Sequence, residues 1–231
     1  MAKAKNPKPT EDTTDSAVPE GVSATESNTK KYTILLASHN EALEWLEFVP
    51  AVREDYEIVV SNSSGKEYPL ADRTVQRDNF GREAGHYLQY IVDNYDNLAE
   101  AVVFMQASPW AHINGEAMTL QLLRLFYGSP SFPEPMCYLG AQYGSSTFFN
   151  LDDAPELYNT MLPFYHNGDT PQWVPFTIGA QFYVQREVIQ RLPLAYYEAV
   201  LSVVRSNVNN VSFAHVLEGR WGFVFYHNKT A

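Results

Sequence analysis

Two apolar runs joined by one amphipathic segment constrain the fold of this chain more than any other feature. The first run, YTILLAS at residues 32–38, is almost entirely apolar, as expected of a strand buried on both faces. In the next segment, HNEALEWLEFVPAV, the residues Leu43, Leu46 and Val49 recur near helical spacing, and Asn40 is the expected N-cap. The second run, YEIVVSNSS, ends in turn residues. Strand, helix and strand within about 30 residues are typical of the βαβ unit of a parallel sheet.

The middle of the chain extends this pattern. Arg82 to about Asn94 is predicted to form a helix, and the apolar residues 101–106 to form a third strand. The inward face of the predicted helix carries Ala84, Tyr87, Leu88 and Ile91. A second helix is expected over residues 118–126.

The second half of the chain combines a long irregular stretch with further regular elements. Residues 128–177 are rich in Pro, Gly and aromatic residues, and such a stretch inside a domain is usually functional. We expect an active-site wall there, built partly by Tyr143, Phe148, Phe149 and Trp173. After it, GAQFYVQ indicates a strand, and REVIQRLPLAYYEAVLSVV indicates one or two helices interrupted at Pro193. Residues 213–217 indicate a helical turn, and WGFVFYH indicates a closing strand.

These elements predict an α/β fold with two parts. Residues 32–231 are expected to form a single Rossmann-like domain, with a mainly parallel sheet flanked by helices. Residues 1–31 are rich in Lys, Pro, Thr, Ser and Glu and contain no large aliphatic cluster. Such a segment cannot bury enough apolar surface to offset the entropy of ordering, so we expect a disordered tail.

Charge and composition exclude several classes of function. The net charge is −11, and because the first 31 residues hold five Lys and five acidic residues, the whole excess lies in the predicted domain. An acidic domain argues against a nucleic-acid partner. No apolar stretch is long enough to cross a membrane, the N-terminus lacks the apolar centre of a signal peptide, and Cys137 is the single cysteine. We therefore expect a cytoplasmic protein with no membrane partner.

Polar residues follow the first two strands directly. Ser38, His39 and Asn40 come after the first strand, and a Ser-Asn-Ser run ends the second. Ligands of open α/β sheets bind at the carboxyl ends of the strands. Ser38, His39 and Asn40 are therefore predicted to bind substrate.

The segment Asn79-Phe80-Gly81-Arg82-Glu83 is the most informative one. A Gly before a helix lets the backbone approach a ligand closely, and the helix N-terminus together with Arg82 favours a phosphate group. Glu83 is expected to bind a ribose hydroxyl or to act as a first-turn acid that complements the helix dipole. Asn79, Gly81, Arg82 and Glu83 are thus candidate substrate-binding residues. The alternative is a plain turn followed by a charged helix start.

A second candidate segment follows the third strand. Gln106, Ser108 and His112 are placed to contact a ligand there, and Gln181 belongs to the later strand GAQFYVQ. The alternative for the first three is a strand-end turn around a packed Trp. Gln and Ser are poor ligands for the metals that His favours, so no metal ligand is assigned.

The third candidate segment lies near the C-terminus. His215 and Glu218 are three residues apart and share a helical face, and one of them is expected to act as a general base. Arg220 is a further candidate for substrate binding. The alternative is a structural pair between Glu218 and Arg220.

The order of these segments resembles a known family. ILLASHNEALEWL, NFGREAGHYLQYIVDNYDNLAEAVVFMQASPWAH, GAQFYVQREVIQRLP and EGRWGFVFY occur in sequence over most of residues 32–227. This arrangement resembles the domain-of-unknown-function family 3431, whose members carry a similar Asn-x-Gly-Arg-Glu-Ala before a Tyr-Leu helix. The resemblance implies a fold rather than an activity.

A more distant similarity is to nucleotide-sugar-dependent glycosyltransferases of the GT-A architecture. Those enzymes also open with an apolar strand that runs into Asn-Glu, and an Asp-x-Asp motif holds their divalent metal. Here Gln106, Ala107 and Ser108 stand at that place, and Mg²⁺ or Mn²⁺ would be held poorly without carboxylates. The resemblance implies a nucleotide sugar as donor. It also implies either metal-independent chemistry, in which Arg82 and His112 meet the diphosphate, or a lost activity.

Three functions remain open on these grounds. The first is a glycosyltransferase-like enzyme that binds a nucleotide sugar at the carboxyl edge of the sheet, with Glu218 or His215 deprotonating the acceptor. The second is a hydrolase on the same scaffold that uses Glu83 and Glu218. The third is a non-catalytic protein that binds a carbohydrate or a nucleotide.

Overall fold

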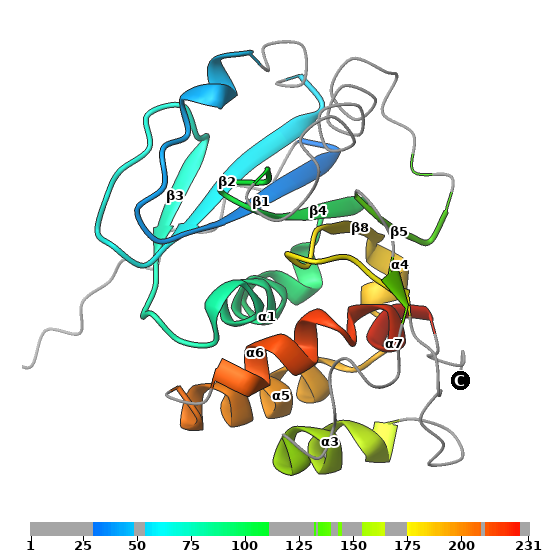
Figure 1. Cartoon of the computed structure of the whole chain (residues 1–231). Helices are drawn as coiled ribbons and strands as arrows, with labels where there is room; N and C mark the ends of the chain where they lie inside the picture. Colours follow the sequence, from blue (N-terminus) through cyan, green and yellow to red (C-terminus); the bar gives the residue numbers. More distant parts are fainter. Residues whose placement is uncertain are drawn as a thin grey trace, which may run out of the picture.

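The computed structural model describes residues 30–48, 54–110, 134–139, 154–164, 175–208 and 211–226, together with residues 132, 143 and 144. Within these ranges one six-stranded sheet organises the molecule (Figure 1). Its strands, in spatial order, are β3 (Arg73–Gln76), β2 (Tyr56–Asn62), β1 (Tyr32–Ser38), β4 (Ala101–Gln106), β8 (Phe182–Gln185) and β5 (Met136–Tyr138). Two short strands, β6 (Tyr143–Gly144) and β7 (Pro175–Phe176), pair separately.

The sheet is mixed, which corrects the prediction of a mainly parallel sheet. β1 is parallel to both β2 and β4, and β2 is parallel to β3. β8, however, lies between β4 and β5 and is antiparallel to both. A short apolar run such as FYVQ carries no signal for strand direction, because direction depends on the path of the chain between strands.

Helices pack mainly against one face of this sheet. Figure 1 shows α1 beneath the strands, with α6 and α5 in the next layer and α3 farther out. The α-helices are α1 (Arg82–Asn94), α3 (Pro155–Met161), α4 (Arg186–Ile189), α5 (Leu194–Ser206), α6 (Val211–Glu218) and α7 (Trp221–Tyr226). The 3₁₀ helices are η1 (Glu44–Phe48), η3 (Tyr95–Asn97) and η5 (Leu162–Phe164).

Alternate side chains of the strands build two apolar cores. Leu35, Val59 and Phe104 face α1 and the C-terminal helices. Ile34 and Val103 point to the opposite face, in the core that also contains Leu43 and Leu46 from around η1. Both faces of the central strands are therefore covered, which explains why their sequences are apolar without alternation.

Several predicted elements are confirmed. The strands at residues 32–38 and 101–106 have the predicted bounds, and so does the helix over residues 82–94. Ala84, Tyr87, Leu88 and Ile91 are all buried on the inner face of that helix, as predicted. Pro193 separates α4 from α5, and α6 contains the predicted helical turn at residues 213–217.

The predicted closing strand and the predicted N-cap are wrong. WGFVFYH was expected to be a closing strand, but residues 221–226 form the helix α7. Residues 221–225 are buried all round, and a short run that is apolar on every side has no periodicity that distinguishes helix from strand.

The described part of the connection between β1 and β2 contains the 3₁₀ helix η1. Asn40 does not cap this helix, because η1 begins only at Glu44, four residues after it.

Some predictions fall outside the described residues. They include residues 1–29 of the predicted tail, the helix over residues 118–126, and the side chains of the proposed aromatic wall, Tyr143, Phe148, Phe149 and Trp173. Among the helices of the described ranges, none has both the length and the apolar character needed to cross a membrane.

Candidate functional site

A pocket of about 370 Å³ opens at the carboxyl ends of β1, β2 and β4, next to the first turns of α1. Hydroxyl, amide, imidazole, guanidinium and carboxyl groups make up most of its lining. Among the described residues the lining consists of Ala37, Ser38, His39, Glu41, Ser63, Asn79, Arg82, Glu83, His86, Gln106 and Ser108. The parallel part of the sheet therefore places its pocket where ligands of α/β sheets bind.

The entry into α1 is formed by two successive residues in the left-handed region. Gly81 has φ 62° and Arg82 has φ 51°. A Cβ on Gly81 would lie 2.3 Å from Cγ1 of Val204, so this position requires Gly for space as well as conformation. A left-handed Arg is uncommon and costs free energy, and such residues cluster at functional sites. The turn places Arg82 and Glu83 at the pocket.

Glu83 combines deep burial with a position on the pocket. The residue is only 9% exposed. Burial, together with the charge of Glu218, raises the pKa of Glu83 to about 7. Its own backbone N–H, the charge of Arg82 and a hydrogen bond from the Gln106 side chain act in the opposite direction. A carboxyl group in this environment can take up and release a proton near neutral pH.

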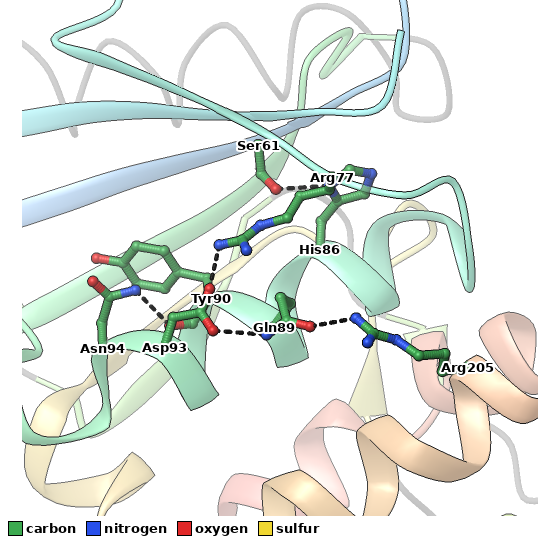
Figure 2. Close-up of polar contacts among 8 residues, drawn as sticks. All are labelled: Ser61, Arg77, His86, Gln89, Tyr90, Asp93, Asn94 and Arg205. Atoms are coloured by element: carbon green, nitrogen blue, oxygen red, sulfur yellow. Dashed lines mark hydrogen bonds and ion pairs between the residues drawn. The ribbon is translucent and has the colours of Figure 1, made fainter. Parts of the chain in front are cut away.

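His86 is a buried, neutral imidazole on the same helix. Its Nδ1 lies 2.7 Å from the hydroxyl of Ser61 at the end of β2 (Figure 2). Burial, together with the positive charge of Arg77, lowers the pKa of His86 to about 4. At neutral pH this ring therefore offers the pocket a hydrogen-bonding group without charge.

A chain of polar contacts fixes α1 from its outer face (Figure 2). Arg77, just after β3, forms an ion pair with Asp93. Gln89 Nε2 donates to Asp93 Oδ1 at 2.7 Å, and Arg205 of α5 donates to Gln89 Oε1 at 2.7 Å. The helix is thus connected to the sheet edge on one side and to α5 on the other, which positions its first turn.

At the end of β1, Glu41 organises the backbone. Its Oε2 accepts hydrogen bonds from the Ser38 hydroxyl at 2.9 Å and from the backbone N–H of His39 at 2.6 Å. Although burial acts to raise the pKa of Glu41, the donors from His39, its own backbone, Ser38 and Asn40 together hold that pKa below its usual range. The pocket therefore contains one carboxyl held ionised and one, Glu83, that titrates near neutrality. His39 Nδ1 lies 3.0 Å from the hydroxyl of Ser63.

The loop before β8 closes the inner side of the site. Gly179, with φ 87°, donates its N–H to Oε1 of Glu218. A Cβ on Gly179 would lie 3.5 Å from Oε1 of Gln106 and 3.4 Å from Nε2 of Gln181. Gln181 Nε2 donates to the carbonyl of Pro109 at 2.9 Å. The end of β4, the loop before β8 and the last turn of α6 therefore meet behind Gln106.

Helix α6 also reaches the start of α1. Arg82 Nη1 donates to His215 Nε2 at 2.9 Å on the exposed side of the site. This contact requires a ring nitrogen without a proton on His215.

Most of the substrate-binding residues predicted from the sequence lie together. Ser38, His39, Asn79, Arg82, Glu83, Gln106 and Ser108 line the pocket. Gly81, Gln181, Glu218 and His215 lie directly behind or beside it, through the contacts given above. Asn40 is exposed and Arg220 is buried, and neither belongs to the lining that the described residues form. His112 lies outside the described residues.

Glu41, Ser63 and His86 also line the pocket, although they were not predicted from the sequence. His86 lies three residues after Glu83 on the inward face of a correctly predicted helix, so helical spacing could have placed it next to Glu83. Glu41 follows the polar run at the end of β1, but it was assigned to an amphipathic helix. No group of three His, Cys, Asp or Glu side chains in the described ranges is arranged to hold a metal ion.

The family comparison covers this site. The model of the family described as "Protein of unknown function (DUF3431)" matches residues 34–126. This match confirms the family resemblance from β1 to β4, and every lining residue of the pocket lies inside it. Gln181, His215 and Glu218 lie outside the matched range. No curated protein matches the chain.

Proposed function

We propose that this chain is an enzyme that acts on a glycosidic bond, with a sugar bound in the pocket at the carboxyl edge of the sheet. The observation that carries the proposal is Glu83, a buried residue that lines a pocket formed otherwise mainly by hydroxyl, amide and imidazole groups. Sugar hydroxyls both donate and accept hydrogen bonds, so they match such a lining.

In the proposed chemistry Glu83 transfers the proton. A pKa of about 7 lets its carboxyl group act as general base or general acid near neutral pH. Glu41, held ionised by backbone donors, supplies a fixed negative charge in the same pocket. Two carboxyl groups whose surroundings separate their pKa values are typical of enzymes that cleave or form glycosidic bonds.

The form of the reaction that we favour is glycosyl transfer from a nucleotide sugar. Glu83 removes the proton of an acceptor hydroxyl, whose oxygen then attacks the anomeric carbon. The bond from that carbon to the diphosphate breaks, and the diphosphate leaves with the electron pair. Arg82 and the N-terminus of α1, which has no side-chain cap, are suited to hold the leaving diphosphate.

The charge balance of the pocket supports hydrolysis as a second candidate. Arg82 shares the pocket with Glu41, which is held ionised, so the two charges offset each other and a neutral sugar is also compatible with the lining. In a hydrolase, water would take the place of the acceptor hydroxyl. The two candidates therefore differ in whether a nucleotide group contributes to binding.

A thermal-shift screen distinguishes these candidates. The probes are UDP-glucose, GDP-mannose, UDP, and neutral disaccharides such as maltose and cellobiose, each with and without Mn²⁺. Glycosyl transfer predicts a rise in Tm with a nucleotide sugar that exceeds the rise with UDP or with the neutral sugars, because ligands that bind only the folded state stabilise it. Hydrolysis predicts the largest rise with a neutral saccharide.

The variants for this screen are Arg82→Ala, Glu83→Gln and, as a matched control, Glu198→Gln on the exposed face of α5. Arg82→Ala is expected to abolish the additional rise caused by the nucleotide group. Glu83→Gln is expected to lower turnover of a responding ligand by about 10²-fold or more, the usual contribution of a proton-transferring group. Full turnover in Glu83→Gln, or no response to any sugar-containing probe, contradicts the proposal.

A further inference from the structure

The imidazole of His86 contacts the interior of the sheet on one side and the pocket on the other. His86 is 6% exposed and belongs to the pocket lining, whereas Ser61 is 2% exposed and lies outside the lining that the described residues form. Nδ1 of His86 lies 2.7 Å from the Ser61 hydroxyl, as Figure 2 shows. The second ring nitrogen, Nε2, takes no part in this contact. It has no hydrogen-bond partner among the described residues, so it is available to a molecule in the pocket.

The hydroxyl of Ser61 has little choice of partner. Its backbone is fixed inside the sheet, where Ser61 pairs with Ala37 of β1 and with Val75 of β3. Within the described ranges, the ring of His86 is the one hydrogen-bond partner of its side chain. A buried hydroxyl that donates to no acceptor costs free energy, so the Ser61 proton is expected to point at Nδ1.

The direction of this hydrogen bond decides the tautomer of the ring. Burial, together with the charge of Arg77, lowers the pKa of His86 to about 4, so the ring carries one proton near neutral pH. If Nδ1 held that proton, Ser61 would have to accept it, and its own O–H would lack an acceptor among the described residues. If Nε2 holds the proton, the Ser61 O–H donates to the lone pair of Nδ1, and both buried groups are satisfied.

We infer that Ser61 is a positioning residue that donates its hydroxyl proton to Nδ1 of His86, so that Nε2 carries the ring proton and presents an N–H donor to the pocket. His86 then selects ligands that place an acceptor oxygen against Nε2. A protonated Nε2 cannot take a proton from an acceptor hydroxyl, so this assignment leaves proton transfer to Glu83. That the selected oxygen belongs to a sugar rests on the proposed function.

The other imidazole of the pocket lacks this constraint. Nδ1 of His39 lies 3.0 Å from the hydroxyl of Ser63, which resembles the pairing of His86 with Ser61. His39 is exposed, however, so water can pair with either of its ring nitrogens and with the hydroxyl. The same two residue types therefore fix a tautomer at His86, where both partners are buried, and not at His39.

The test is a ¹⁵N–¹H correlation spectrum of the imidazole rings near neutral pH, on full-length protein labelled at His and without ligand. Protonated and unprotonated ring nitrogens have well-separated ¹⁵N shifts, and the His86 signals are assigned by their loss in His86→Gln. We expect the Nε2–H tautomer for His86 in the wild type. Ser61→Ala should move the Nδ1 resonance, because this nitrogen loses its donor. The control Ser202→Ala, on the exposed face of α5, should leave it in place.

An Nδ1–H tautomer, or comparable amounts of both tautomers, in the wild type overturns the inference. An unchanged Nδ1 resonance in Ser61→Ala also overturns it. If Ser61→Ala does not fold, the wild-type spectrum still decides the tautomer. These measurements need no ligand, so their failure is distinct from failure of the proposed function, which the sugar screen decides. Where UDP-glucose or maltose raises the Tm, its addition should shift the Nε2–H signal, and an unmoved signal contradicts the role of this donor in binding.

Discussion

Single residues in this site have properties set more by burial than by their sequence neighbours. Glu83 and His86 are three residues apart on α1, and burial shifts their pKa values in opposite directions, to about 7 and about 4. Both shifts favour the neutral form of the group. The helix can therefore present two uncharged hydrogen-bonding side chains to the pocket near neutral pH, beside the charge of Arg82.

For His86 this shift predicts an acid-sensitive contribution to stability. Its pKa is about 4 in the folded protein, against about 6.5 in the unfolded chain. The unfolded state therefore binds the proton first, and the contribution is fully present above about pH 6.5 and is lost as the pH falls through about 4. The loss amounts to about 3 kcal/mol.

Urea unfolding of wild type and His86→Gln between pH 7.5 and 4 measures this loss of stability. The wild type should lose more stability than the variant, and parallel curves would show that His86 is not buried in its neutral form.

Among the elements, α1 depends on a close approach at Gly85. A Cβ at this position would lie 2.1 Å from the carbonyl oxygen of Phe80, which is backbone and cannot rotate away. Gly85 N–H also donates to the carbonyl of Gly81 at 3.2 Å, within the turn that carries Arg82 and Glu83. The geometry of the site is thus tied to the packing of one helical turn.

We therefore expect Gly85→Ala to cost about 3 kcal/mol of unfolding free energy and to displace the first turn of α1. Gly65→Ala is the matched control: its Cβ would meet nothing within 4 Å, so only its φ of 78° opposes the change. That backbone cost is about 1 kcal/mol. Chemical denaturation of both variants gives the two values, and an equal loss in both would contradict the steric argument.

The sequence predicted α1 well because its inward residues repeat with helical spacing, and the glycines and Arg82 marked its start. It could not predict the direction of β8 or the helical state of residues 221–226, since short apolar runs fit either structure. Gln106 and Ser108 were predicted from a strand end, which is a local signal. The contact between Arg82 and His215 spans 133 residues and depends on how α6 packs, which no local pattern encodes.

At the scale of the whole molecule, two regions of the chain contribute residues to the candidate site. The parallel strands β1, β2 and β4 supply the floor of the pocket at their carboxyl ends, together with α1. The later chain, through β8 and α6, supplies the residues behind Gln106 and Glu83. The family match covers the first region and stops before the second. In the proposed function both regions take part, because Gly179, just before β8, lies against the Gln106 side chain that lines the pocket.

The central claim is that a sugar binds in the pocket at the carboxyl edge of the sheet. It is tested most directly by mapping the amide chemical-shift changes when a sugar-containing probe is added to ¹⁵N-labelled protein. The probe is UDP-glucose or maltose, whichever raises the Tm more. The account predicts the largest changes at residues 38–41, 79–86 and 106–108, and, where the probe is UDP-glucose, their reduction in Arg82→Ala but not in Glu198→Gln. Changes centred elsewhere, for example along α3 at residues 155–161, would contradict it.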